Sequence, residues 1–292
     1  MTTKTWLRRN TKPLHGKRIA ITGSTGGLGR ELCRDLALLG ADLILLDRNA
    51  ERSNAFREEL LGEFDGRSIE CISVDLSDFS SVRRATEELK QREIDCFLHN
   101  AGAYSIPRKI CDTGYDNVFQ INFVSPYYMI RELLPNLRAR GGRAVAVGSI
   151  AHNYSKIDPD DVDFSTRTKA SKVYGNAKRY LTYSLLSLAE QEEGVDVCVA
   201  HPGISFTNIT AHYPKLIFAL IKHPMKVIFM KPKHACLSIL LGVYEKCSSD
   251  EWIGPRLFDV WGLPKKKKLR TASPEERARI AHIAENIYQK LR

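Results

Sequence analysis

Two residues four positions apart, Tyr174 and Lys178, have the types and spacing that acid–base chemistry needs. Among the eleven tyrosines, only Tyr174 is followed by a lysine at this distance. Residues i and i+4 share one face of a helix, so the ammonium group can favour ionisation of a phenol whose ordinary pKa is about 10. Ser149 ends a strand-like run just before them. Because a chain of this composition should contain about one such pair by chance, its context must decide.

A glycine-rich turn lies between a predicted strand, Arg18–Thr22, and a predicted helix that runs through Leu39. Glycine lets the backbone approach a pyrophosphate closely, while the N–H groups that begin a helix face the anion. Asp47 closes the next apolar run, where its carboxylate could accept hydrogen bonds from both ribose hydroxyls of an adenosine. An ordinary tight turn with a surface aspartate is the alternative. The turn residues expected at the cofactor are Gly23, Ser24, Thr25, Gly27, Leu28 and Gly29.

Six motifs occur in one order along the chain: Thr22-Gly23-x-x-x-Gly27-x-Gly29, His99-Asn100-Ala101-Gly102, Asn122, Ser149, Tyr174-x-x-x-Lys178 and Pro202-Gly203. Together they closely resemble the classical short-chain dehydrogenases/reductases, from about residue 16 to residue 262. The tail at 260–264 and the long interval between Ser149 and Tyr174 look most like the retinol-dehydrogenase-like and WW-domain-oxidoreductase-like members.

Strand-like runs alternate with amphipathic helical stretches, which predicts an α/β fold with a parallel sheet covered by helices on both faces. We expect a single-domain, doubly wound Rossmann-type sheet of about seven strands. A basic N-terminal arm (1–15) precedes the catalytic domain (16–262), which includes a lid at about 204–233, and a basic loop and C-terminal helix (263–292) follow. The predicted strands are Arg18–Thr22, Asp42–Leu46, Ile69–Val74, Cys96–His99, Ala144–Gly148, Val195–Ala200 and Arg256–Val260.

The resemblance implies a role for each catalytic candidate. Tyr174 would exchange a proton with the substrate oxygen, and Ser149 would hold that oxygen and stabilise its developing charge. Lys178 would lower the pKa of Tyr174 and bind the nicotinamide ribose. Asn122 would correspond to the family asparagine whose backbone leaves room for a water linked to the lysine. A polar residue that satisfies a helix bend is the alternative for Asn122.

Further cofactor contacts are also implied by the resemblance. Asp75 would meet the adenine amino group, Thr207 would hold the nicotinamide carboxamide, and Asn100 would stabilise the central strands and border the cofactor. Asp75 could instead cap the helix that begins near Phe79, a role that Ser77 or Asp78 fills equally well. The remaining cofactor-binding candidates are Arg48, Leu76, Ala101, Gly102, Tyr174, Lys178, Pro202 and Gly203.

The sequence favours NAD as the cofactor, with NADP as the alternative. Asp47 would repel a 2′-phosphate, whereas Arg48 directly after it can accommodate one. Gly26 stands where many NADP-preferring relatives carry a basic residue.

The segment between Asp196 and Glu245 contains no acidic residue, while five lysines interrupt its apolar runs. In the family this segment forms the lid over the substrate, and its apolar side chains suit a lipophilic small-molecule alcohol or ketone of steroid, retinoid or fatty type. Peripheral contact with a membrane surface is an alternative use of the lysines, and a solvated lid is another. The apolar lid residues are Ile209, Tyr213, Leu216, Phe218 and Phe229.

Composition limits the location and the partners. The seven cysteines form no Cys-x-x-Cys pair and the eight histidines form no ligand pattern, so we expect reduced thiols, a cytoplasmic protein and no metal. We expect neither a secretory signal nor a membrane span, because no window approaches eighteen apolar residues. The net charge of +10 accompanies no nucleic-acid module, so no specific nucleic acid is expected.

The C-terminal region begins with a capping box at Ser273–Glu276, which predicts a helix to about Leu291. Its isoleucine stripe packs on the domain or faces a partner. Relatives often assemble through the helices after Asn100 and Tyr174, so a homodimer or homotetramer is implied. Two other functions stay open: a catalytically silent dinucleotide-binding regulatory protein, and a nucleotide-sugar epimerase or dehydratase on the same scaffold.

Overall fold

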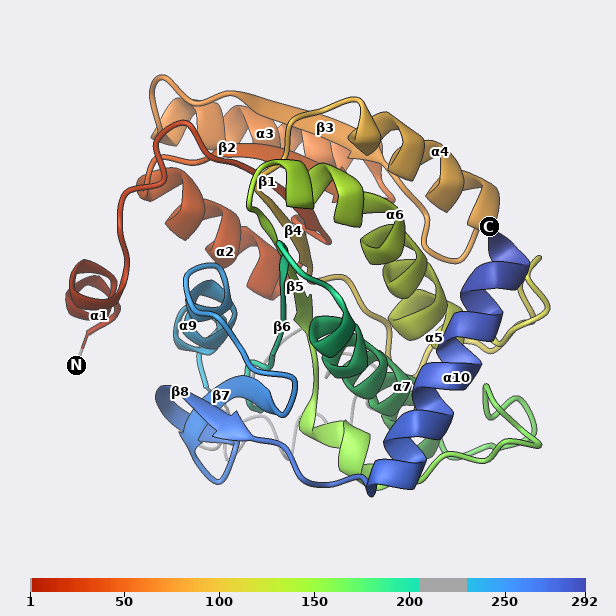
Figure 1. Cartoon of the computed structure of the whole chain (residues 1–292). Helices are drawn as coiled ribbons and strands as arrows, with labels where there is room; N and C mark the ends of the chain where they lie inside the picture. The colour runs from red at the N-terminus through yellow and green to blue at the C-terminus, as the bar shows by residue number, and fades with distance from the viewer. Residues whose placement is uncertain (1, 205–229) are drawn as a thin grey trace, which may run out of the picture.

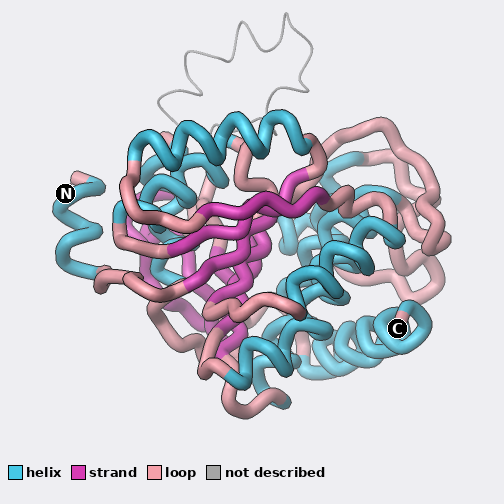
Figure 2. The backbone as a smooth tube through the Cα atoms, turned by 90° about the horizontal axis from the view of Figure 1, so that it is seen from above, coloured by secondary structure: helices cyan, strands magenta, loops and turns pink. Residues whose placement is uncertain are grey.

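The computed structural model describes residues 2–204 and 230–292, which form one eight-stranded sheet between two layers of helices (Figures 1 and 2). The strand order is β3-β2-β1-β4-β5-β6-β7-β8, parallel except for the β7–β8 pair. The strands are β1 Arg18–Thr22, β2 Asp42–Asp47, β3 Ile69–Ser73, β4 Cys96–His99, β5 Arg143–Val147, β6 Asp196–Ala200, β7 Glu251–Leu257 and β8 Trp261–Lys268. The predicted Rossmann-type α/β fold is confirmed.

Helices cover both faces because successive side chains of each strand point to opposite sides. In β1, Ala20 joins the core on one face, while Ile19 and Ile21 join the core on the other. The α-helices are α1 Thr3–Asn10, α2 Gly27–Leu38, α3 Ala50–Glu63, α4 Phe79–Lys90, α5 Asn117–Phe119, α6 Ser125–Ala139, α7 Ala170–Gln191, α9 Pro232–Gly242 and α10 Pro274–Leu291. The π-helical turn η1 spans Gln120–Val124, and the 3₁₀ turn η2 spans Ile150–Tyr154.

The order of the strands reverses at β1, which pairs with β2 on one side and with β4 on the other. The connections that leave these strands diverge at this point, so a crevice opens beyond their carboxyl ends. The glycine turn follows β1, Asp47 ends β2, and the turn that starts at Asn100 follows β4. The topology therefore gathers the predicted cofactor residues at one edge of the sheet.

Two predictions about the C-terminal part of the sheet were wrong. The strand expected at 256–260 runs instead from Glu251 to Leu257, and it ends because Phe258 and Asp259 adopt positive φ angles of 52° and 58°. Lys265–Lys268, expected in a loop, form half of the antiparallel edge strand β8. Charged side chains suit an edge strand because they discourage pairing with other chains.

The N-terminal arm also has more structure than a basic arm requires. Residues 3–10 form α1, whose Trp6 and Leu7 are buried in the core that α2 and α9 share. The predicted lid at 204–233 lies almost entirely outside the described residues.

Helix α10, which runs beside α7 in Figure 1, packs on the domain along the predicted isoleucine stripe. Ile280 and Ile287 are buried, and the hydroxyl of Tyr288 donates to Glu132 of α6 at 2.6 Å. Helix α10 therefore occupies part of the surface of α6 and α7, the two helices through which assembly was expected. That assembly stays a prediction.

Replacement of Ile280 by Ala should lower the free energy of unfolding by about 2–4 kcal/mol, since the side chain is fully buried and leaves a cavity. Ile283→Ala is the matched control on the same helix, because Ile283 is only partly buried and should lose less. Urea denaturation of both variants measures the difference. Equal losses would contradict the packing of α10 on α6 and α7.

Candidate active site

The loop between β1 and α2 forms a cradle of backbone N–H groups. Gly23 has a positive φ of 69°, and a side chain on Gly29 would lie 2.1 Å from the carbonyl oxygen of Gly23. Gly26 precedes the first turn of α2, and no side chain caps that turn and no acidic residue lies in it. These N–H groups, together with the positive end of the helix dipole, favour an anion.

A cavity of about 430 Å³ opens over this cradle and extends along the carboxyl ends of β1, β2 and β4. Twelve of the predicted cofactor residues line it, and Ile106, Ile121 and Tyr104 add apolar surface. Ser24, in contrast, is buried, and four other predicted residues lie outside the lining: Tyr174, Lys178, Pro202 and Gly203. Thr207 lies outside the described residues. The twelve predicted residues are Gly23, Thr25, Gly27, Leu28, Gly29, Asp47, Arg48, Asp75, Leu76, Asn100, Ala101 and Gly102.

Asp47 holds the glycine loop in place. Its Oδ1 accepts hydrogen bonds from the backbone N–H and the hydroxyl of Thr25, at 3.1 and 2.9 Å. Its Oδ2 accepts from the hydroxyls of Ser24 and Ser53. A carboxylate offers about four lone-pair positions. All four of those at Asp47 are therefore used within the chain.

Asn100 and Asp75 also line the cavity, and each forms hydrogen bonds within the chain. The side-chain amide of Asn100 donates to the carbonyl oxygens of Thr22 and Gly23, at 3.1 and 3.0 Å, which ties β4 to the glycine loop. Asp75 accepts from the backbone N–H and the hydroxyl of Ser77. Asp78, rather than Asp75, caps α4. Asp75 lines the cavity, and its contact with an adenine stays a prediction.

The catalytic candidates meet where η2 and α7 come together. Tyr174 lies in the first turns of α7, and its phenol forms a hydrogen bond with Ser149, the residue before η2. Lys178 is almost completely buried, and its ammonium group donates to the carbonyl oxygen of Val147 at 2.8 Å. A side chain on Gly102 would lie 3.7 Å from that nitrogen, so Lys178 adjoins the end of the cavity.

Burial shifts the two pKa values in opposite directions. Burial raises the pKa of Tyr174 to about 12, although the hydrogen bond with Ser149 opposes the rise. Burial lowers the pKa of Lys178 to about 7. The nitrogen of Lys178 lies 5.8 Å from the centre of the Tyr174 ring. That Lys178 lowers the pKa of Tyr174 stays a prediction.

Asn122 lies in η1, where its side chain fastens a neighbouring loop. Its amide donates to the carbonyl oxygens of Ala103 and Val118, at 2.8 Å each, and its Oδ1 accepts from the N–H of Ala103. A π-helical turn inside a longer helix is frequent at functional sites. These contacts support the view that a polar residue satisfies a distorted helix, and they also place Asn122 beside Gly102.

Sequence reasoning missed Tyr104, which joins the cavity to the catalytic phenol. Its ring lines the cavity and meets the ring of Tyr174 edge to face, with 5.3 Å between centroids. The nearby residues Asn100 to Gly102 were singled out by their motif, whereas Tyr104 carries no such signal.

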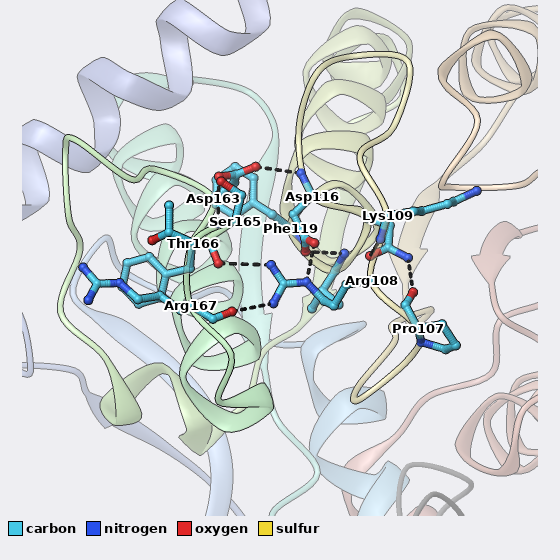
Figure 3. A network of polar contacts seen from close by, with 12 residues as sticks. Pro107, Arg108, Lys109, Asp116, Phe119, Asp163, Ser165, Thr166 and Arg167 are labelled. Carbon is cyan, nitrogen blue, oxygen red and sulfur yellow. Dashed lines mark hydrogen bonds and ion pairs between the residues drawn. The ribbon is translucent and has the colours of Figure 1, made fainter.

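The insertion between Ser149 and Tyr174 is fastened by Arg108 (Figure 3). Arg108 donates to the carbonyl oxygens of Phe164 and Arg167, at 3.0 Å each, and pairs with the buried carboxylate of Asp116. The backbone N–H of Asp116 donates in turn to Asp163 at 2.7 Å. One guanidinium thus joins the insertion to the turn that begins α5.

The insertion in turn supports Tyr174. Phe164, which has a positive φ of 56°, packs with Val118 and Val173, and the ring of Tyr174 lies against this cluster. No spacing rule predicts this contact, because it depends on two loops that are distant in sequence.

The geometry fits a dinucleotide with a nicotinamide end. The N–H cradle at Gly26 suits a pyrophosphate, and the cavity runs from Asp75 at one end to Gly102, beside Lys178, at the other. Ile106 and Ile121 offer apolar walls between these ends.

A family model described as short chain dehydrogenase matches residues 17–215. The chain belongs to this family. It is therefore an oxidoreductase of the NAD(P)-binding short-chain dehydrogenases/reductases.

Curated relatives include the dehydrogenase/reductase SDR family member FEY of Arabidopsis thaliana, 28% identical over 92% of this chain and 76% of its own length. Human retinol dehydrogenase 13 is 29% identical over 68% of this chain and 61% of its own length. The chain also covers 65% of the short-chain dehydrogenase TIC 32 A of Brassica napus, at 30% identity.

Solved structures share the fold. A protein from Mycobacterium paratuberculosis superposes with a TM-score of 0.74 at 22% identity, covering 97% of this chain and 96% of its own. A short-chain dehydrogenase from Sphingobium yanoikuyae, in complex with NADPH, has a TM-score of 0.60 at 20% identity, with 77% and 83% covered.

Gly29→Ala should weaken dinucleotide binding by about tenfold or more, because the new methyl group forces the backbone of the glycine loop to shift. Gly62→Ala is the matched control: Gly62 also lies in a helix, where nothing stands within 4 Å of a new side chain. Titration with the reduced cofactor, followed by its fluorescence, gives both dissociation constants. Unchanged binding by Gly29→Ala would contradict the placement of the pyrophosphate.

Proposed function

We propose that the protein interconverts a lipophilic alcohol and the corresponding ketone or aldehyde, with Tyr174 as the general acid and base. The observation that carries this proposal is the hydrogen bond between Ser149 and the phenol of Tyr174, whose ring contacts Tyr104 of the cavity wall. When bound, the nicotinamide cofactor supplies or accepts the hydride.

Three side chains of the chain have separate roles in the proton transfer. With a pKa near 12, Tyr174 is protonated at neutral pH, so its hydroxyl can donate to the carbonyl oxygen of a ketone. Ser149 donates a second hydrogen bond that stabilises the negative charge on that oxygen. Lys178, with a pKa near 7, can exchange protons at neutral pH and can restore the proton of Tyr174.

The surroundings of Tyr174 support a lipophilic substrate. The rings of Tyr104 and Phe164 and the side chain of Ile106 lie around the phenol and bring apolar surface to it. Relatives named retinol dehydrogenase are consistent with this class of substrate.

None of the helices formed by residues 2–204 and 230–292 has the length and apolar character of a membrane span.

Tyr174→Phe should lower kcat by about 10²–10⁴-fold with a panel of lipophilic secondary alcohols and ketones, since it removes the proton-transferring hydroxyl. Tyr115→Phe is the control, a partly buried tyrosine outside the cavity lining. Reduced-cofactor absorbance measures turnover, and cofactor binding should survive in both variants.

Two results would favour another function. Cofactor binding without turnover of any substrate favours the silent regulatory protein. Conversion of a nucleotide sugar without net change in the cofactor favours the epimerase or dehydratase. Full activity in Tyr174→Phe would contradict the catalytic assignment.

We propose NADP as the cofactor, although the sequence alone favoured NAD. Asp47 already accepts four hydrogen bonds from the chain, which leaves it little capacity for ribose hydroxyls. Arg48 and Arg52 are exposed and line the same end of the cavity. Within residues 2–204 and 230–292, neither guanidinium forms an ion pair, so both suit a 2′-phosphate.

Arg48→Gln should raise the Kd for NADPH about tenfold or more, because a hydrogen bond between charged groups contributes about 1.5–3 kcal/mol. The Kd for NADH should change little. Arg57→Gln is the matched control on α3, where Arg57 pairs with Glu58 away from the cavity. Selective loss of NADH affinity in Asp47→Asn would instead support NAD.

A further inference from the structure

A buried histidine lies behind the catalytic serine. His152 has no exposed surface, and its Nδ1 lies 2.7 Å from the backbone carbonyl oxygen of Ser149. A carbonyl oxygen only accepts hydrogen bonds, so we assign the proton of the neutral ring to Nδ1. Burial lowers the pKa of His152 to about 4, which keeps the ring neutral at physiological pH.

This assignment fixes the direction of a hydrogen-bond chain into the C-terminal segment. Nε2 of the neutral ring must accept, so the hydroxyl of Thr271, 2.9 Å away, donates to it. The Thr271 hydroxyl has one hydrogen, and it is donated to His152. The hydroxyl of Tyr183, 2.6 Å from the Thr271 oxygen, must therefore donate to it, while the N–H of Thr271 donates back to Tyr183 at 3.1 Å.

A buried arginine of α7, the helix that carries Tyr174, also binds His152 and Thr271. Arg179 of α7 is 3% exposed and forms two hydrogen bonds with Glu276 of α10, at 2.7 and 2.6 Å. It also donates to the carbonyl oxygens of His152 and Thr271, at 3.1 and 2.8 Å. Burial alone would raise the pKa of Glu276, but Arg179 outweighs this effect and holds it below the ordinary value.

These contacts link three separate parts of the chain. The turn after Ser149, the helix of Tyr174 and the segment before α10 meet at His152 and Arg179, and α10 lies beside α7 in Figure 1. Thr271 and Glu276 lie beyond residue 215, where the match to the family model ends. The C-terminal segment is thus joined both to the serine turn and to the helix that carries Tyr174.

We propose that Thr271 and Glu276, acting through His152 and Arg179, are positioning residues that hold Ser149 against Tyr174. The proposal rests on the proposed function, because it assigns Ser149 to the reacting oxygen. None of the four residues lines the cavity. Removal of either C-terminal group should therefore reduce kcat and leave cofactor binding intact.

Thr271→Val keeps the shape of the side chain but removes the donor to His152. Its kcat should fall by about tenfold to a hundredfold, because small displacements of a catalytic group have effects of that size. The Kd for the cofactor should stay within about twofold, and Thr271→Ser, which restores a hydroxyl, should recover most of the activity. A purely structural role would lower the melting temperature and leave kcat unchanged at temperatures well below it.

Glu276→Gln and Glu285→Gln form a matched pair on α10. Both glutamates bind an arginine, but Glu285 pairs with Arg131 of α6, and its side chain is 41% exposed against 16% for Glu276. Glu276→Gln should lower kcat about tenfold, whereas Glu285→Gln should stay within about twofold of the wild type. Equal kcat in these two variants, together with wild-type kcat in Thr271→Val, would overturn the proposal.

A measurement without turnover tests the hydrogen-bond chain itself. In protein labelled with ¹⁵N-histidine, the His152 signals, identified by their loss in His152→Asn, should report a neutral ring with the proton on Nδ1. Thr271→Val should shift the Nε2 signal. A proton on Nε2, or signals unaffected by Thr271→Val, would overturn the chain. A wild-type protein that has this tautomer yet is inactive on every alcohol and ketone would instead contradict the proposed function.

Discussion

The hydrogen bonds between the carboxyl ends of β1 and β4 hold the two halves of the site together. Thr22 and Asn100 supply them: the threonine hydroxyl accepts from the N–H groups of Asn100 and Ala101, and the asparagine amide donates to the backbone after β1. Parallel strands that diverge at this point leave a crevice. Without these bonds, the glycine loop and the loop that carries Tyr104 would have no fixed separation.

Burial then sets the chemistry at the end of this crevice. The same exclusion of water that raises the pKa of Tyr174 lowers that of Lys178, because each shift disfavours the charged form. A protonated phenol therefore lies near an amine that titrates around neutrality. Asp47 shows a related effect: a carboxylate that the sequence presents as a ligand group is used instead to hold the loop that surrounds it.

Polar contacts outside the family motifs maintain this geometry. Arg108 fastens the insertion that supports the ring of Tyr174, and Arg179 joins the serine turn to α10. Both guanidinium groups bind backbone carbonyl oxygens as well as a carboxylate. Planar groups with several fixed donors suit this task, because they can hold two or three chain segments at once.

The sequence by itself determined the α/β fold, six of the strands to within one residue and the cradle of glycines, and it singled out Ser149, Tyr174 and Lys178 as catalytic candidates. Short apolar runs, glycine turns and residue spacing are local signals, and local signals suffice for such features. The final strands were misplaced, since the turn at Phe258 and the lysine-rich edge strand have no apolar pattern to reveal them.

Only the tertiary structure decided which polar groups remain available for ligands. The carboxylate of Asp47 accepts hydrogen bonds from Ser24, Thr25 and Ser53. The ammonium group of Lys178 donates to the carbonyl oxygen of Val147, which is distant in the sequence. The same holds for Tyr104, His152 and Glu276, whose types occur throughout the sequence. Their roles arise from burial and hydrogen-bond direction, which depend on what folding places beside each group.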